Sequence, residues 1–355
     1  MIFKLFAKKR LFLLLFFLSH STSESYWVRY GWQVFNSAGD ARILSLGGAA
    51  VTDYGTAISP LFNPAASNRV GLHNINYTHQ SRLAGMINSD LIGLPIKNFS
   101  RPFNLIILHE GIDQIPDTRD ILLDFGIDGI PGTGDVGEGN GVLDDGERLD
   151  ESKLTYFSQR QLGIHVSSSF EINSVEAGFA IKTLYHSLDK YSATGIGLDI
   201  GFIVFPWENG RFGLTIRDVT TSWQVWDNGT VERFKPTIIT GLAQTIVFPK
   251  SNVKLTAMSN MLLDAGGKMI DDDFRLGNYG GKLIFGLNAI YNNQLALRIG
   301  RNSIGSFTTG LGISWENLSL DYAFLNEPSG SGLGSTHLIS VSVSADWIKN
   351  YIEQL

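Results

Sequence analysis

The chain has 355 residues, 43% of them hydrophobic and only 17% charged, whereas an ordinary soluble domain carries about 25% charged residues. It contains no cysteine, which excludes a disulfide scaffold, a cysteine-ligated zinc site and thiol catalysis. The 22 phenylalanines, 11 tyrosines and 7 tryptophans argue against intrinsic disorder, and the net charge of −6 argues against a nucleic-acid partner. Few charges combined with 39 glycines and many aromatic residues favour a β-protein with much of its surface away from water.

Residues 1–23 have the pattern of a secretory signal peptide. Four basic residues come first, and residues 11–18 form a continuous apolar stretch followed by small residues suited to cleavage. This stretch is far shorter than the roughly 20 residues of a membrane-spanning helix, so we expect export and removal of the segment rather than a membrane anchor. No later apolar run has spanning length, and a membrane destination would therefore require a closed β-barrel.

Residues 24–70 do not follow the strand pattern of the rest of the chain. The glycine pair Gly47 and Gly48 permits backbone conformations and close approach that a side chain would prevent. Pro64 removes a hydrogen-bond donor and biases Asn63 away from helix. A glycine-rich, nearly uncharged segment ahead of a barrel predicts a plug folded inside the lumen. A periplasmic arm or a first pair of strands is the alternative.

Residues 71–346 alternate between large apolar and small or polar side chains, which is the periodicity of β-strands. The segments run to about ten residues, whereas soluble strands average five or six. Several of them end in aromatic residues, as expected for the interfacial girdles of a membrane barrel. The fold predicted is an all-β transmembrane antiparallel barrel of about 14 strands, with the large face toward lipid; a secreted β-sandwich is the alternative.

Tight turns alternate with longer connections at residues 222–235, 263–279 and 326–332, which predicts periplasmic turns and extracellular loops. By alternation four charged side chains face the lumen, where a buried charge requires a partner. We expect them to pair and to anchor the plug. They are Asp199, Lys282, Arg298 and Asp321.

An acidic insertion occupies residues 110–153, with thirteen acidic and three basic residues and hence a net charge of −10. Its carboxylates alternate with glycines in two partial matches to a calcium-binding loop. In such a loop, oxygen atoms of residues close together in the sequence surround one ion. We predict that one or two structural calcium ions order this loop, although an acidic run is more commonly just solvated. The candidate ligands are Asp124, Asp128, Asp135, Glu138, Asn140, Asp144 and Glu147.

His165 and Ser167 form the one candidate for catalysis, because they lie two residues apart on one face of a predicted strand. A serine nucleophile needs a base within hydrogen-bonding distance and a third group that orients the base. No residue of the sequence is indicated for that third role. We therefore predict that the protein is not an enzyme.

The plug segment carries the pattern Ala41-Arg42-x-Leu44-x-Leu46-Gly47-Gly48-Ala49, followed by Asp53, Ala57 and Asn63-Pro64-Ala65. With the glycine-punctuated strands, this resembles the PorV/PorQ type of outer-membrane protein within the FadL-like (long-chain fatty-acid transporter) superfamily. The resemblance implies a fourteen-stranded barrel in the outer membrane of a Gram-negative-type bacterium. It also implies an N-terminal plug fixed by Gly47, Gly48, Asn63 and Pro64. Residues 347–355 continue past the usual end of the family.

Members of this family either move hydrophobic solutes or act in type IX protein secretion, where the PorV-like member escorts cargo for surface attachment. The resemblance therefore implies a role in secretion or surface attachment, with outer-membrane lipid, secretion-system components or exported cargo as partners. The alternative is a FadL-like channel for hydrophobic small molecules, and a third hypothesis is a calcium-ordered structural barrel. Uptake predicts an apolar pocket between plug and wall and a lateral gap at a kinked strand. Export predicts a large exposed loop surface.

Overall fold

The computed structural model describes residues 25–27, 32–70, 74–96, 101–219, 221–265, 267, 272–326, 332 and 334–353. The predicted signal peptide lies outside the described residues. Among the helices within these ranges, none has the length and apolar character needed to cross a membrane.

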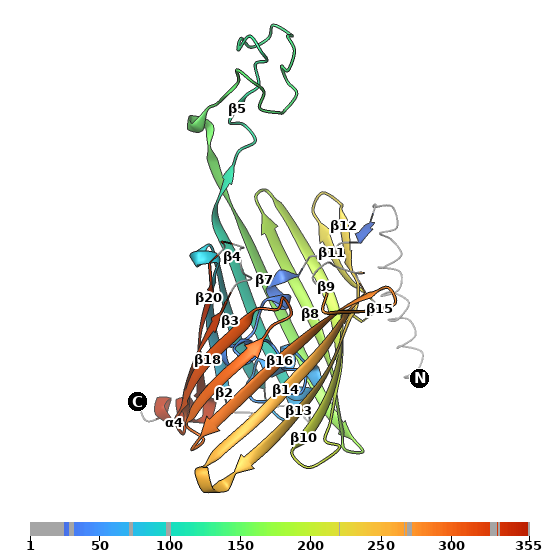
Figure 1. Ribbon diagram of the computed structural model, residues 1–355, viewed down its shortest axis with the longest axis vertical. Coiled ribbons are helices and arrows are strands. Elements are labelled where there is room, and N and C mark those ends of the chain that lie inside the picture. The colour runs from blue at the N-terminus through green and yellow to red at the C-terminus, as the bar shows by residue number, and fades with distance from the viewer. Residues whose placement is uncertain are drawn as a thin grey trace.

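Fourteen antiparallel strands form a closed barrel (Figure 1). Each strand pairs with the next along the chain, and the last strand pairs with the first, so the wall has no free edge over its paired length. The strands are β2 (Asn74–Arg82), β3 (Ile87–Ile96), β4 (Phe103–Asp117), β7 (Thr155–Ile172), β8 (Val175–Leu188), β9 (Tyr191–Val204), β10 (Gly210–Arg217), β13 (Thr237–Phe248), β14 (Val253–Asp264), β16 (Tyr279–Tyr291), β17 (Leu295–Arg301), β18 (Phe307–Ser314), β19 (Leu318–Leu325) and β20 (Thr336–Ser344). The predicted fold is confirmed.

The two faces of the wall differ as the alternation predicts. Leu297 and Ile299 of β17 and Leu311 of β18 point outward and are 58%, 51% and 58% exposed. Between them, Arg298 and Thr308 point into the lumen and are buried. A closed barrel whose outer surface is a belt of aliphatic and aromatic side chains is stable only when lipid covers that belt. The protein is an outer-membrane β-barrel.

The connections at the two ends of the barrel differ in length. The lower end in Figure 1 has short turns, including η5 (Pro249–Ser251) and the turn at Asn292 and Asn293, whose φ angles are 52° and 56°. The upper end carries η3 (Leu83–Gly85), β15 (Phe274–Leu276) and the longest loop. The predicted tight turns are therefore found at one end of the barrel. Of the predicted loops, residues 266, 268–271 and 327–331 lie outside the described residues.

The acidic insertion is shorter than predicted. Strand β4 continues through Glu110 to Asp117 and pairs with β7, with an irregularity between Ile112 and Ile115 where Gln114 adopts a φ of 54°. The acidic residues up to Asp117 belong to a strand because β4 stays paired with β7 on both sides of this irregularity. The loop itself covers residues 118–154, contains β5 (Leu122–Leu123), β6 (Arg148–Leu149) and η4 (Glu151–Lys153), and rises clear of the barrel (Figure 1).

Residues 222–235 are not the loop that the sequence indicated but a hairpin. β11 (Ser222–Trp226) pairs with β12 (Val231–Phe234) and also with the upper part of β9. The short β1 (Ser25–Trp27) runs parallel to β12 on its other side. The upper wall between β9 and β13 is therefore built from a separate hairpin rather than from one continuous strand pair.

The plug lies within the barrel and joins its wall at β2. It contains α2 (Gln33–Asn36), α3 (Ala41–Leu44), η1 (Ser59–Leu61) and η2 (Pro64–Asn68). The Asp40 carboxylate accepts the backbone N–H of Ile43 at 2.7 Å and caps α3. The Asn63 side chain caps η2 in the same way, and Pro64 occupies its first position. The barrel ends at Ser344, two residues before the predicted boundary, and α4 (Ala345–Ile352) follows.

Candidate functional site

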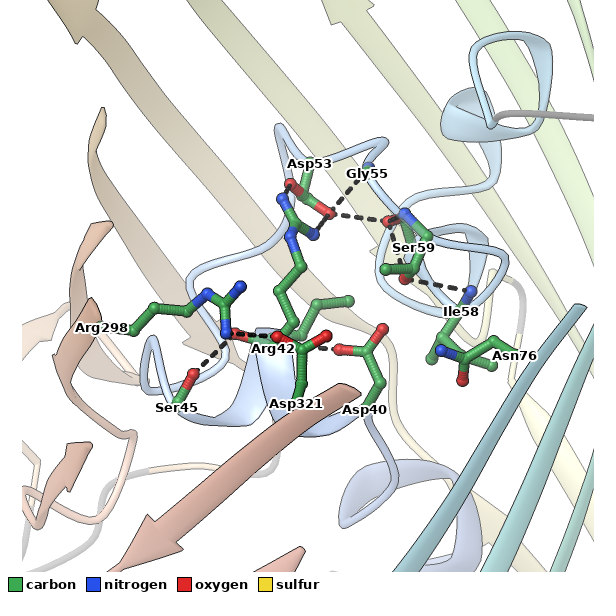
Figure 2. A network of polar contacts seen from close by, with 12 residues as sticks. Asp40, Arg42, Ser45, Asp53, Gly55, Ile58, Ser59, Asn76, Arg298 and Asp321 are labelled. Atoms are coloured by element: carbon green, nitrogen blue, oxygen red, sulfur yellow. Dashed lines mark hydrogen bonds and ion pairs between the residues drawn. The ribbon is translucent and has the colours of Figure 1, made fainter. Parts of the chain in front are cut away.

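The centre of the plug is a buried network of polar contacts (Figure 2). The Arg42 guanidinium donates two hydrogen bonds of 2.7 Å to the two carboxylate oxygens of Asp53. Asp53 also accepts the Ser59 hydroxyl at 2.7 Å and the Gly55 backbone N–H at 3.1 Å. A bidentate, fully hydrogen-bonded pair tolerates burial, whereas either charge alone would be costly. Arg42 and Asp53 therefore hold the two halves of the plug together.

The pKa values of two buried carboxyl groups of the plug, Asp40 and Asp53, are shifted in opposite directions. Burial raises the pKa of Asp40 to about 6, although Arg42 and the backbone N–H of Ile43 act against the shift. Burial also acts on Asp53, but there the paired Arg42 guanidinium outweighs it and holds the pKa well below its usual range. Asp53 is therefore the charged partner of Arg42, whereas Asp40 takes up its proton at about pH 6.

The motif residues of the plug meet the wall at glycines. A Cβ on Gly47, whose φ is 70°, would overlap the Arg301 carbonyl, and a Cβ on Gly300 would overlap the Leu46–Gly47 backbone. Asn63 donates to the Val51 carbonyl at 2.7 Å and to the Phe202 carbonyl of the wall at 3.1 Å. Further glycines of the wall make room for the plug backbone in the same way; they are Gly178, Gly213 and Gly286. Gly310 makes room for the Ser45 side chain of the plug. The small lumen face thus fits a closely packed plug.

The four predicted lumen charges occupy lumen-facing positions, but the structure does not bring them together as one group. Arg298 and Asp321 form an ion pair of 2.7 Å between β17 and β19, and Asp199 pairs with Lys182 at 2.9 Å. Lys282 stands near the upper end of β16 and is partly exposed. These two ion pairs join strand to strand within the wall, so the plug is held by other residues.

One charged contact between plug and wall has no clear signal in the sequence. Glu176 of β8 is 1% exposed and accepts Nε of Arg69 at 2.9 Å and the Asn68 amide at 2.6 Å. Ser67 and Ser167 are linked through their hydroxyl oxygens at 2.9 Å. Polar residues at the end of η2 thus fix the plug to β7 and β8. Only the register of β8 reveals that Glu176 faces inward.

The upper lumen contains an apolar cluster. Trp32 packs on Phe35 with ring centroids 5.3 Å apart and on Phe234 of β12 at 6.2 Å. Phe35 contacts the wall at Gly163, where a side chain would overlap its ring. Leu184 belongs to the same buried cluster. Aromatic side chains from the start of the plug and from the upper hairpin therefore meet inside a lumen that is otherwise lined largely by polar side chains.

The wall is interrupted beside this cluster. Ile216 pairs with Ile200 and Trp223 with Ile196, so six residues of one strand face only three of β9. Within residues 217–222, Asp218 and Thr221 have φ angles of 54° and 108°. We name residues 217–222 the strand break. Extra residues on one strand bend it and disrupt the ladder locally.

Charged groups fix the strand break. Lys182 lies 2.7 Å from Asp218 and 2.9 Å from Asp199 and is 4% exposed. Its ammonium nitrogen is 5.5 Å from the Trp32 ring centre and 5.7 Å from that of Phe35, within the range of a cation–π interaction. Lys182 therefore contacts both the interrupted wall and the aromatic cluster.

The plug leaves little open space along the upper wall. A cavity lined by Val34, Leu91 and Leu108 has a volume of about 10 Å³, room for one water molecule at most. A larger cavity of about 250 Å³ lies at the lower end and is lined by polar groups, including Arg298 and Asp321. At the strand break the regular ladder to β9 is interrupted, but the Val219 N–H still donates to the Leu198 carbonyl at 2.8 Å, so the lateral gap expected for uptake stays a prediction. The cavity lined by Val34, Leu91 and Leu108 is too small to hold a solute in this conformation.

The acidic loop is ordered by its own backbone. Asp124 accepts the N–H groups of Gly139 and Gly141, both at 2.7 Å, and these bonds, chiefly that of Gly141, lower the pKa of Asp124. Glu147 accepts from Gly126 and Asp144. Asp128, Asp135, Glu138 and Asn140 make similar contacts within the loop. In the described part of the chain no three acidic or histidine side chains are arranged to hold a metal ion, so calcium binding stays a prediction.

His165 and Ser167 both face the lumen and are fully buried. Neither ring nitrogen of His165 has a hydrogen-bond partner among the described residues, and the Ser167 hydroxyl is bonded to Ser67. A serine nucleophile requires direct contact with its base. The pair therefore lacks the arrangement that catalysis needs.

No family model matches the sequence, and no curated protein does. The chain is similar in structure to the P. putida toluene transporter TodX, with 10% identity over 86% of this chain and 98% of that chain and a TM-score of 0.48. It is also similar to a Pseudomonas aeruginosa FadL homologue, with 12% identity over 86% of this chain and 98% of that chain and a TM-score of 0.42. For the CymD monoaromatic hydrocarbon channel the identity is 11% over 85% of this chain and 96% of that chain, with a TM-score of 0.46. What the chain does has to follow from its own residues.

Proposed function

We propose that the protein is a non-enzymatic channel for small hydrophobic solutes, with the conformation described above as its closed state. The observation that carries this proposal is the aromatic cluster of Trp32, Phe35 and Phe234 beside the strand break. In this closed conformation the three rings are buried, and an apolar molecule that displaces part of the plug and contacts them leaves water, which is favourable. Few other lumen positions in the described chain offer such a surface.

The route that fits these features runs sideways through the wall. Below the cluster, the plug backbone is packed against wall glycines and fixed by Arg69 and Glu176, so a straight path would require breaking many contacts. At the strand break the regular ladder to β9 is interrupted, although the Val219 N–H donates to the Leu198 carbonyl at 2.8 Å, and the proposed route continues from there into lipid. A hydrophobic solute gains by moving directly into the acyl chains rather than into a second aqueous compartment.

The experiment measures accumulation of radiolabelled naphthalene, an uncharged aromatic probe, by cells that express the protein. Deleting residues 219–221 shortens the strand break and is expected to reduce accumulation to the level of cells without the protein. W32A removes part of the apolar surface that the solute is proposed to contact and is expected to lower accumulation several-fold. Heat-modifiable gel mobility verifies that each variant forms a barrel.

A pair of engineered disulfides distinguishes the lateral route from a straight one. S67C/S167C joins plug to wall where the hydroxyl oxygens are 2.9 Å apart, and T245C/T256C joins two wall strands at 3.0 Å as the matched control. The native chain has no cysteine, so each bond is unique. A lateral route predicts unchanged accumulation for both oxidised variants. Loss in the oxidised S67C/S167C variant alone would contradict that route, and wild-type cells that accumulate no more than empty cells would overturn the channel itself.

Secretion or surface attachment, in the manner of a PorV/PorQ protein, is the second candidate function. The observation in its favour is the loop at residues 118–154, which stands clear of the barrel and exposes Ile127, Ile130 and Val136 by 65%, 57% and 76%. Exposed apolar side chains on an acidic loop suit a protein partner. A photoreactive label on a V136C variant should then become cross-linked to an exported protein in intact cells, and a label that reacts only with lipid or water would argue against it.

A further inference from the structure

Helix α4 continues the chain after the last barrel strand. It begins where Ser344 accepts the backbone N–H of Trp347 at 3.4 Å, and Asp346 lies in its first turn. A hydroxyl at the helix start and an acidic residue in the first turn both favour helix formation. The chain therefore leaves the wall as a helix of eight residues rather than as a disordered tail.

The helix lies at the foot of the barrel and runs sideways, across the direction of the barrel axis (Figure 1). Its apolar and polar side chains fall on different sides: Trp347, Ile348 and Ile352 share one arc at 100° per residue, and Asp346 and Asn350 lie on the other. Trp347 is 48% and Ile352 is 63% exposed. The apolar arc is thus left largely uncovered by the described part of the protein.

The level of the helix matches the lower aromatic girdle of the wall. Phe248 and Tyr291 end their strands at the lower end, Trp315 directly follows β18, and Trp347 follows the end of β20 by three residues. The side chains of Phe248, Tyr291 and Trp315 are 45%, 50% and 55% exposed toward the outside of the barrel. The apolar arc of α4 is therefore continuous with a surface that lipid already covers.

We propose that α4 lies in the headgroup region of the adjacent membrane leaflet, with Trp347 and Ile352 toward the acyl chains and Asp346 and Asn350 toward water. A helix of this kind lies in the plane of the interface because only there are both of its sides solvated appropriately. The indole ring of Trp347 suits the boundary, since it has an apolar body and one polar N–H group. This membrane contact is independent of whether the barrel conducts solutes.

The test uses single cysteines in the otherwise cysteine-free chain. Nitroxide labels are placed at Ile352 and Asn350, which lie about 160° apart on the helix. L311C supplies a lipid-facing reference and V142C a water-exposed reference, because these side chains are 58% and 59% exposed on the wall and on the loop. The protein is reconstituted into vesicles of phosphatidylcholine and phosphatidylglycerol, and collisions of each label with oxygen and with a water-soluble nickel complex are measured.

The expected result is that the oxygen-to-nickel collision ratio at Ile352 approaches that at Leu311 and is several-fold above that at Asn350. Asn350 is expected to approach Val142. Equal ratios at Ile352 and Asn350, both close to Val142, would show a helix in water and overturn the proposal. A label at Ile352 that collides rarely with both oxygen and the nickel complex, as a side chain packed against protein would, would overturn it as well.

Discussion

Asp40 is the residue of the plug whose protonation state matters most for stability. Its carboxyl is fully buried, one oxygen caps α3, and the other has no hydrogen-bond partner in the described structure. The pKa in the folded protein is about 6, against 3.8 for the free group. Because the folded value is the higher one, the stabilising contribution is complete below about pH 4 and is lost as the pH rises through 6.

The variant D40N tests this assignment. Asn retains an oxygen to cap α3 and carries no titrating proton, so its stability should not change over this pH range. Relative to D40N, the wild type should lose about 3 kcal/mol between pH 4 and pH 8, which is the size of a shift of about two pKa units. The measurement is the thermal unfolding midpoint in detergent at both pH values. Parallel pH profiles for the two proteins would contradict it.

Gly300 tests the close packing of plug and wall. A methyl group there overlaps the Leu46–Gly47 backbone, which cannot rotate away, so G300A should weaken plug attachment by about 1–3 kcal/mol. G111A is the matched control, because its Cβ meets only the flexible Arg160 side chain. Protease cleavage within the plug should increase for G300A alone. Equal protection of both variants would mean that the plug adjusts without cost.

Single residues differ in how far the sequence could identify them. The motif residues Gly47 and Asn63 were predictable, since a backbone turn and a cap have local signals, and both contact the wall as expected of a plug. Lys182 and Glu176 were not, because their partners lie on strands far apart in sequence. Which charges meet depends on the register around the barrel, and register is a property of the assembled wall.

At the scale of elements, alternation predicts fourteen strand starts, each within two residues of the observed one. The predicted starts are near Leu72, Ile87, Pro102, Tyr156, Asn173, Ala193, Arg211, Pro236, Asn252, Gly280, Gln294, Gly305, Asn317 and Gly334. The strand pattern is reliable here because lipid on one side and plug on the other impose it along the whole length. The hairpin of β11 and β12 was missed, although Asn228-Gly229 between two alternating runs is a hairpin signal. The strand break has no comparable local signal, because it arises where the register of one strand against β9 shifts from Ile216–Ile200 to Trp223–Ile196, and register is not readable from a single strand.

The acidic loop is expected to be dispensable for folding. Its contacts are internal, through β5 with β6 and the carboxylates with backbone N–H groups. Arg119 makes an exposed ion pair with Asp189, and such solvent-screened pairs add little to stability. Replacing residues 118–154 with a two-residue Asn-Gly turn should leave the barrel folded, with unchanged heat-modifiable mobility. An unfolded or protease-sensitive barrel would contradict this independence.

The same variant supplies the control for calcium. If the predicted ions order the loop, calorimetric titration of the wild type should give calcium heat at millimolar concentration, and the loop-deleted protein should give none. Absence of heat in both proteins would remove calcium and leave the loop's own N–H groups, of the backbone and of the Asn140 side chain, as the described partners of these carboxylates.

At the scale of the whole molecule, the barrel is asymmetric along its axis. One end carries the acidic loop and the upper hairpin, and the other carries short turns and α4 (Figure 1). Bacterial barrels place short turns in the periplasm and long loops outside, and this rule decides which leaflet α4 contacts and from which side a solute reaches the aromatic cluster. The orientation therefore determines which of the two leaflets is adjacent to α4 and from which side a solute approaches.

Thiol labelling of intact cells measures that orientation directly. Val142 lies in the acidic loop and Asn293 in a lower turn, and both are exposed. A membrane-impermeant maleimide should label V142C in intact cells but label N293C only after the outer membrane is permeabilised. Wild-type protein gives no background, because the chain has no cysteine. The reverse pattern would place α4 on the outer surface. Solutes would then approach through the lower cavity lined by Arg298 and Asp321. An apolar molecule is disfavoured there, because it would displace water from these charged groups.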